Sequence, residues 1–271
     1  MNQLHTILNA SADALKQGII ALSIGLIVFT IMERMFVARI PKKSWRATFL
    51  DLQYAFLSML YPPFIYFILS ALFAYLSLRF YGTFHNPELA WPVFAGELMA
   101  ALFVRDCLIY LRHRIFHTRF VWAFHSIHHS SEEVSWISAA RFHPAENLIE
   151  ATGEILLFIG CQVIGVDPMV LSTMALIVGF YNFFIHSNLP WTFGPLRYVF
   201  VSPVLHRWHH SDAPEAMDKN FAAMFSCIDV VLGTFYMPKN TMPETTGLSA
   251  GEKAGHPRTF TGQLLHPFKK R

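Results

Sequence analysis

The feature that most constrains this chain is a series of apolar stretches long enough to cross a lipid bilayer. A membrane-spanning helix needs about 20 mostly apolar residues. The sequence has four such segments, at 18–37, 54–78, 90–111 and 155–184. The fourth is interrupted by Asp167 and Pro168, a turn signal that predicts two helices joined as a hairpin. The sequence therefore predicts an all-α integral membrane protein with four or five transmembrane or re-entrant helices.

Composition supports this class of protein. Of the 271 residues, 54% are hydrophobic and 14% are charged, whereas soluble domains carry about 25% charged residues. The net charge of +3 is too small to indicate a nucleic-acid partner, and none is expected. The three cysteines lie far apart in apolar stretches and form no metal-binding or redox pair.

Charges beside the first apolar segment predict the orientation of the chain. Four cations follow that segment: Arg39, Lys42, Lys43 and Arg46. The positive-inside rule places them in the cytoplasm and the N-terminus outside. The first segment lacks a basic region before it and a small-residue cleavage site after it, so we expect an uncleaved anchor.

Following the segments in order brings two polar stretches to the cytoplasmic side. These stretches, 112–150 and 186–271, are expected to form one histidine-rich helical cap, and residues 221–236 within it are apolar enough to lie in the membrane interface. No repeat or long linker divides the chain. Residues 1–271 are therefore predicted to be a single membrane domain.

Histidine clustering carries the functional signal. Eight of the 14 histidines lie in three short motifs, HRIFH, HSIHH and HRWHH, which together occupy 15 positions. Random placement would put fewer than one histidine there. The motifs contain His113, His117, His125, His128, His129, His206, His209 and His210.

Histidines three or four residues apart on a helix face the same side, so each motif can present two or three imidazoles to a metal. Imidazole is a ligand for Zn, Cu, Fe and Ni. Eight nitrogens are too many for one ion, so two ions are predicted. His186 is a ninth candidate ligand, because it follows the fourth apolar segment on the same side. Carboxylates that could orient these imidazoles are Asp106, Glu132, Glu133, Asp212 and Asp218.

The remaining histidines are interpreted differently. Isolated histidines are more often ordinary polar residues than ligands, and this interpretation applies to His5, His85, His256 and His266. His143 precedes Pro144 and could be a ligand, a hydrogen-bond partner of a ligand or a residue that begins a helix.

Taken together, these motifs resemble those of the fatty acid hydroxylase and sterol desaturase superfamily of membrane di-iron oxygenases. The resemblance covers about residues 95–236, in the family's order. Asp106, Tyr110, His113, Arg114 and His117 match D-x3-Y-x2-H-R-x2-H, and His125, His128, His129 and Ser130 match H-x2-H-H-S. Arg141, His143 and Pro144 resemble the R-x-H-P of the sterol desaturase branch, and His206, His209 and His210 match the last H-x2-H-H.

The closing part of the pattern is less complete. Asp218, Asn220 and Phe221, then Asp229, Gly233 and Thr234, resemble D-x-N-[YF]-G and W-D-x-L-F-G-T. Ala222 replaces the usual glycine and Ile228 the usual tryptophan. His186 matches the family's intermediate histidine, whereas Asn182 stands where some members have a further histidine and could bind metal directly, bind it through water or only support the helix.

The resemblance implies the activity. Two iron ions held by the nine histidines would use O2 to hydroxylate or desaturate a C–H bond of a membrane lipid, such as a sterol or a fatty acyl chain. An external electron donor of the cytochrome b5 or ferredoxin type is implied, since the chain has no haem-attachment motif, no GxGxxG and no iron–sulfur cysteines. A bacterial inner membrane is favoured over the endoplasmic reticulum, with the active site on the cytoplasmic side.

Three alternatives use the same histidines. A histidine-rich membrane metal transporter would need ionisable residues near the middle of the bilayer, where Glu97 and Glu154 are the main candidates. A zinc hydrolase would need H-E-x-x-H, but Arg114 follows His113. A b-type haem protein would leave at least five histidines unused. The sequence does not select among lipid substrates, or between hydroxylation and desaturation.

Overall fold

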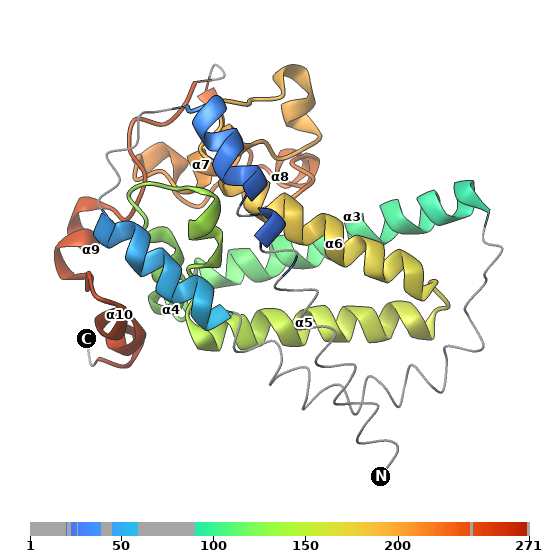
Figure 1. Cartoon of the computed structure of the whole chain (residues 1–271), viewed down its shortest axis with the longest axis horizontal. Helices are drawn as coiled ribbons and strands as arrows, with labels where there is room; N and C mark the ends of the chain where they lie inside the picture. The colour runs from blue at the N-terminus through green and yellow to red at the C-terminus, as the bar shows by residue number, and fades with distance from the viewer. Residues whose placement is uncertain are drawn as a thin grey trace, which may run out of the picture.

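Three long helices run alongside one another and carry a group of shorter elements at one end (Figure 1). The computed structural model describes residues 20–38 except 21, 22 and 26, together with 45–58, 90–238 and 241–269. The long helices are α3 (Trp91–Phe116), α5 (Pro144–Val163) and α6 (Pro168–His186). α6 lies in the middle of the packing, since it contacts α3, the short helix η1 (Trp136–Ala140) and α7 (Pro203–His209).

The shorter elements are also helical. Besides η1 and α7 they are α4 (Trp122–His129), η2 (Gly194–Tyr198), η3 (Pro214–Ala216), α8 (Cys227–Val231), α9 (Ala250–Gly255), α10 (Phe260–Leu265) and η5 (His266–Phe268). In the described part of the chain, the only β-type pairing is one bridge between Ser211 and Thr246. The prediction of an all-helical protein is confirmed.

Local sequence explains where the long helices begin. α5 and α6 each start with proline at their first position, where its missing N–H costs nothing. Before α6, the Asp167 side chain accepts a hydrogen bond from the backbone N–H of Met169 at 2.7 Å. The predicted turn at Asp167 and Pro168 is therefore the connection between α5 and α6.

α3 is longer than the predicted apolar segment 90–111. It continues to Phe116 and ends at His117, so the first histidine motif lies on its last turn rather than at the start of a separate cap. The reason is physical: charged residues after Leu111 lower the hydropathy, but no proline or glycine interrupts the backbone hydrogen bonds before His117.

The N-terminal helical residues pack on the shorter elements. Within the helical stretch 45–58, Asp51 forms a fully buried ion pair with Arg141, and the Tyr54 hydroxyl donates to Gln263 Oε1 at 3.0 Å. The predicted segment 54–78 therefore begins in a helix that packs on the cap, and its residues 59–78 lie outside the described residues. In the earlier stretch 27–35, Glu33 Oε1 accepts from the backbone N–H of Trp136 and Asn188.

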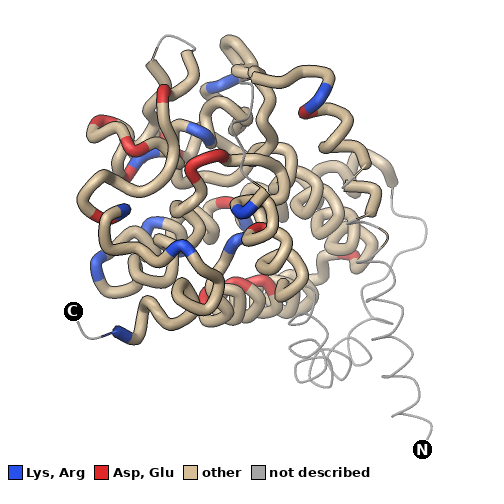
Figure 2. The backbone as a smooth tube through the Cα atoms, turned by 60° about the vertical axis from the view of Figure 1, so that its left-hand side comes forward, with Lys and Arg blue, Asp and Glu red and all other residues tan. Residues whose placement is uncertain are grey.

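The long helices expose many apolar side chains. α6 is the one helix among the described residues that is long and apolar enough to cross a membrane. Large exposed hydrophobic residues also occur on α3 and α5, for example Met99, Phe103, Leu108, Leu156 and Val163. Lys and Arg lie interspersed with Asp and Glu over the shorter elements (Figure 2).

The expected interfacial stretch 221–236 is mostly turned inward. Phe221, Phe225 and Ile228 belong to the hydrophobic core, and only the end of α8 exposes apolar residues, with Val231 82% exposed. The stretch is a compact turn with a five-residue helix and not an amphipathic helix, because its apolar residues are needed to fill the space beside α3.

Candidate metal centre

All nine predicted histidines converge, and they form two groups. The five-histidine group contains His113, His117, His125, His129 and His209. The four-histidine group contains His128, His186, His206 and His210. In each group one ring nitrogen per residue lies within 4.8 Å of all the others. The nine residues thus form two candidate sites, as the excess of ligands over one ion predicts.

Each of the two later motifs contributes to both groups. On α4, His125 and His129 are one turn apart and belong to the five-histidine group, whereas His128 faces the four-histidine group. On α7 and the residue after it, His209 joins the first group, and His206 and His210 join the second. The division follows helical geometry, since residues four apart share a face.

Acceptors around the five-histidine group fix the direction of its imidazoles. The Nδ1 atom of His113 lies 2.9 Å from the carbonyl oxygen of Phe221, and that of His209 lies 2.8 Å from the carbonyl oxygen of Lys219. A carbonyl oxygen can only accept, so Nδ1 carries the proton and Nε2 keeps its lone pair. The Nε2 atoms of His113 and His125 are 3.1 Å apart, and those of His125 and His129 are 3.2 Å apart.

Carboxylates orient two more members of this group. Asp218 Oδ1 is 3.1 Å from His117 Nδ1, and Glu146 Oε1 is 2.5 Å from His125 Nδ1. The Nε2 atoms of His117 and His209 are buried and have no hydrogen-bond partner. Buried, unpartnered lone pairs aimed at one point suit a cation, because imidazole ligates divalent metals through this nitrogen. The residues present therefore fit a metal ion.

One loop supplies three of these acceptors. Residues 218–221 provide the Asp218 carboxylate and the carbonyl oxygens of Lys219 and Phe221. Asp218 and Asn220 have positive φ values of 55° and 58°, which Asp and Asn tolerate better than most residues. The Asn220 side chain also bonds to the backbone N–H and carbonyl oxygen of Tyr236, both at 2.7 Å.

Two buried aspartates bind the backbone N–H groups at the end of this loop and just after it. Asp229 accepts from the backbone N–H of Phe221 and Ala222. Asp106, on α3, accepts from the next three backbone N–H groups, those of residues 223–225. The aspartates of the closing and opening motifs thus shape the loop that orients the histidines.

The four-histidine group is oriented by backbone carbonyls. The Nδ1 atoms of His128 and His186 lie 3.3 Å and 2.8 Å from the carbonyl oxygens of Arg141 and Asn182. Phe142 stacks on His128, with ring centroids 4.2 Å apart. The buried Nδ1 atoms of His206 and His210 have no hydrogen-bond partner. His206 Nε2 lies 3.0 Å from His186 Nε2 and 3.2 Å from His210 Nε2.

Burial keeps the histidines neutral. It lowers the pKa of His113 to about 3 and lowers the pKa values of His125, His128 and His209 well below the ordinary value. Protonated imidazole cannot bind a metal, so these residues are in the ligating form at neutral pH.

The other sequence candidates lie outside both groups. His143 begins α5: its Nδ1 accepts from the backbone N–H of Ala145 at 3.0 Å, and its Nε2 donates to the carbonyl oxygen of Leu264. The His256 and His266 rings contact each other and belong to neither group. His5 and His85 lie outside the described residues.

Of the five carboxylates proposed to orient imidazoles, Asp218 contacts a histidine. Asp106 instead binds backbone N–H groups, Glu132 pairs with Lys253, and Asp212 accepts from Thr245. Sequence reasoning missed Glu146. The available signal was its spacing of four from Glu150 and of eight from Glu154, which places three glutamates on one face of α5.

Two cavities reach the histidines. One, of about 310 Å³, lies between α3, α5 and α6 and touches both groups; Phe142, Asn182 and Glu146 are among its lining residues. The other, of about 280 Å³, touches His117, His129 and His209, all from the five-histidine group. The two groups are therefore accessible from one shared side, and the five-histidine group also from a second.

Comparison with known proteins agrees with this geometry. The fatty acid hydroxylase family model matches residues 98–234, more than half of the chain. The chain belongs to the fatty acid hydroxylase family, and its histidine groups fit the family's histidine boxes.

Characterised relatives are lipid hydroxylases and monooxygenases. An ornithine lipid hydroxylase of Rhizobium tropici is 30% identical over 67% of this chain and 53% of its own length. The alkylglycerol monooxygenases of Caenorhabditis elegans and Danio rerio are 32% and 31% identical, over 29% and 34% of their own lengths. The chain thus spans about half the length of the first relative and about a third of the other two. No solved structure matches the chain.

Proposed function

We propose that this protein is a membrane-embedded di-iron enzyme that hydroxylates a C–H bond of a membrane lipid, with the nine histidines as metal ligands. The observation that carries the proposal is the convergence of these histidines into two groups beside a shared cavity of about 310 Å³. Hydroxylation is favoured over desaturation because the relatives are named as hydroxylases and monooxygenases.

When bound, the two iron ions would supply the activation of O2 and the oxidation of the C–H bond. The chain's own residues have a different task. The Nδ1 acceptors, among them Glu146, Asp218 and the carbonyl oxygen of Phe221, hold each imidazole with its lone pair toward the site. His125 and His128 are buried and line the cavity with their imidazoles, so little of either ring meets solvent.

The exposed apolar surfaces of α3, α5 and α6 support a position in the bilayer, with lipid reaching the cavity between these helices. The proposed topology is multi-pass, with the cap on the cytoplasmic side. Electrons would come from a separate carrier protein of the cytochrome b5 or ferredoxin type.

The transporter alternative finds no support in the residues it requires. Glu97 Oε2 accepts from the backbone N–H of Asp167, and Glu154 pairs with Arg105 at 2.9 Å. Both glutamates join neighbouring long helices, and the histidines gather in two adjacent groups instead of forming a path along those helices.

Lipid mass spectrometry of cells with and without the protein tests the function. We expect lipids heavier by one oxygen atom, and two iron ions per chain in the purified protein. His128→Ala and His209→Ala should each abolish the new lipids, whereas His256→Ala is a matched control outside both groups. Unchanged lipids together with stoichiometric zinc or haem in the purified protein would contradict the proposal.

A further inference from the structure

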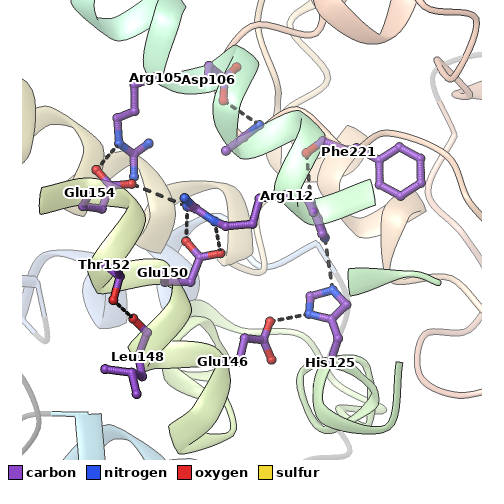
Figure 3. Close-up of polar contacts among 12 residues, drawn as sticks. Arg105, Asp106, Arg112, His125, Glu146, Leu148, Glu150, Thr152, Glu154 and Phe221 are labelled. Carbon is purple, nitrogen blue, oxygen red and sulfur yellow. Dashed lines mark hydrogen bonds and ion pairs between the residues drawn. The ribbon is translucent and has the colours of Figure 1, made fainter. Parts of the chain in front are cut away.

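One wall of the shared cavity is charged, although its surroundings are apolar. Arg105, Glu150 and Glu154 line the cavity, and Glu146 lies beside them next to His125. Figure 3 shows the three glutamates following one another along α5, with Glu150 and Glu154 facing the arginines of α3 and Glu146 facing His125. Charged residues in segments that contact lipid are costly, and they usually mark a functional path or site.

The wall is a connected network. Arg112 Nε donates to Glu150 Oε1 at 2.6 Å, and a second Arg112 nitrogen bonds to the other Glu150 oxygen. Arg105 Nε donates to Glu154 Oε2 at 2.9 Å, and Arg112 also lies 3.6 Å from Glu154. Gly153 lies against the end of the Arg112 side chain, so a larger residue there would require the guanidinium to shift.

The carboxylates are the accessible part of this network. The side chains of Glu150 and Glu154 are 31% and 25% exposed, whereas those of Arg105 and Arg112 are 13% and 14% exposed. A carboxylate offers about four acceptor positions, and the contacts above leave some of them unused on both glutamates. The carboxylate oxygens of the wall are therefore more exposed to a ligand than its guanidinium groups are.

The ion pairs of the wall are balanced in charge, since Glu150 and Glu154 stand against Arg105 and Arg112. Its more exposed atoms belong to the carboxylates, so a cationic group that enters the cavity meets acceptor oxygens first. A ligand with a positive, hydrogen-bond-donating group would form charge-assisted hydrogen bonds with Glu150 and Glu154. An ion pair that served only to join α3 and α5 would not need its carboxylates exposed to a cavity.

We propose that Glu150 and Glu154, supported by Arg105 and Arg112, form a headgroup subsite that binds a lipid through an amine. The inference rests on the proposed function and deepens it by naming the substrate class, a lipid with an amine-bearing headgroup. Residues four apart on a helix are about 6 Å apart along its axis, so Glu150 and Glu154 lie about 6 and 12 Å along α5 from Glu146, which contacts His125. The oxidised carbon is therefore near the headgroup and not far along an acyl chain.

Binding of matched probes to the purified metal-loaded protein tests the subsite. The probes are N-octanoylornithine, its form acetylated on the side-chain amine, and 1-O-octylglycerol. Acetylation removes the cation and leaves the chain and the carboxylate unchanged. We expect the free amine to bind about tenfold to a hundredfold more tightly than the acetylated form, and more tightly than the glycerol ether. Equal affinity of the first two probes, or preference for the glycerol ether, would overturn the inference.

Variants locate the effect. Glu150→Gln and Glu154→Gln should reduce the preference for the amine, whereas Glu215→Gln, at an exposed position, should keep it. Iron content and unfolding temperature identify a variant that fails to fold, and the probe comparison on the unmodified protein does not depend on any variant. If lipid oxidation and iron are present without amine preference, the subsite is wrong and the function stands. If iron and lipid oxidation are absent, the function itself is wrong.

Discussion

The two histidine groups differ in what holds them. In the five-histidine group, acceptors bind the Nδ1 atoms of four members, and two of these acceptors are carboxylates, Glu146 and Asp218. In the four-histidine group, backbone carbonyls serve His128 and His186, and the buried Nδ1 atoms of His206 and His210 have no hydrogen-bond partner. Carboxylate partners raise the basicity of an imidazole ligand. Similar ligands are thus arranged as two unequal sites, one with carboxylate partners and one whose hydrogen-bond partners are backbone carbonyls.

The largest expected effects come from removing a ligand from one group at a time. His209→Ala should lower the metal bound by the five-histidine group, and His206→Ala that bound by the four-histidine group. Since loss of a supporting partner alone costs about 10- to 100-fold in metal affinity or activity, loss of a ligand should cost at least about 100-fold in lipid oxidation. Metal analysis should give about one ion per chain for each variant. Retention of both ions in either variant would show that the nitrogen removed is not a ligand.

The carboxylates provide a sharper comparison. Glu146→Gln should weaken metal binding by about 10- to 100-fold, because Glu146 is buried against His125. Asp218→Asn should have the smaller effect, since the Asp218 side chain is 73% exposed and water can replace its hydrogen bond. Metal affinity from chelator competition measures both. An effect of Asp218→Asn as large as that of Glu146→Gln would contradict the role assigned to burial.

The loop behind the five-histidine group should respond to a change that touches no histidine. Asn220→Asp keeps the tolerance for positive φ but loses the hydrogen bond donated to the carbonyl oxygen of Tyr236. We expect a loss of about 1 to 2 kcal/mol in folding free energy, and metal lost from the five-histidine group before the other. Thermal unfolding with and without chelator measures the change, and Asn188, which lies outside the loop, offers Asn188→Asp as a comparison. Simultaneous loss of both metals from Asn220→Asp would speak against a loop that serves one group.

The smallest effect is expected beside the four-histidine group. Phe142→Leu removes the ring that stacks on His128 and leaves an apolar residue of moderate size. The expected loss is about 1 kcal/mol of folding free energy, the contribution of one aromatic pair. Thermal unfolding measures it, with Phe124→Leu, which changes a ring next to His143, as the matched control. A loss of iron as complete as in His206→Ala would mean that Phe142 does more than pack.

The sequence made the ligands predictable because their signal is local. Histidine spacing of three and four on a helix brings imidazoles to the same turn, and the three motifs with His186 account for both groups. Pairs four apart share a group, whereas His128 and His209 are each separated from the histidine three positions before them. The helical class was predictable for the same reason. The division into five and four depends on how α4 and α7 are turned toward α3 and α6, and no local pattern reports that rotation.

The supporting residues were harder to identify. No local motif marks Glu146 as a partner of a histidine, because its partner His125 is 21 positions away in the sequence. Asp106 was grouped with possible imidazole partners, yet it binds the backbone of residues 223–225, more than a hundred positions later. Contacts at that separation depend on tertiary packing. The predicted segment was also shorter than α3. The apolar stretch ends at Leu111, where charged residues begin, but the helix continues to Phe116.

The arrangement of α4 sets a fixed distance between the two sites. His125 and His129 reach the five-histidine group, and His128 reaches the four-histidine group from an adjoining side of the same turn. The angular spacing of residues on the α-helix therefore fixes how the two sites lie relative to each other, and His206, His209 and His210 of the α7 motif repeat the division. Inserting or deleting one residue in either helix would misalign both sites at once, so neither site can drift in position while the other keeps its geometry.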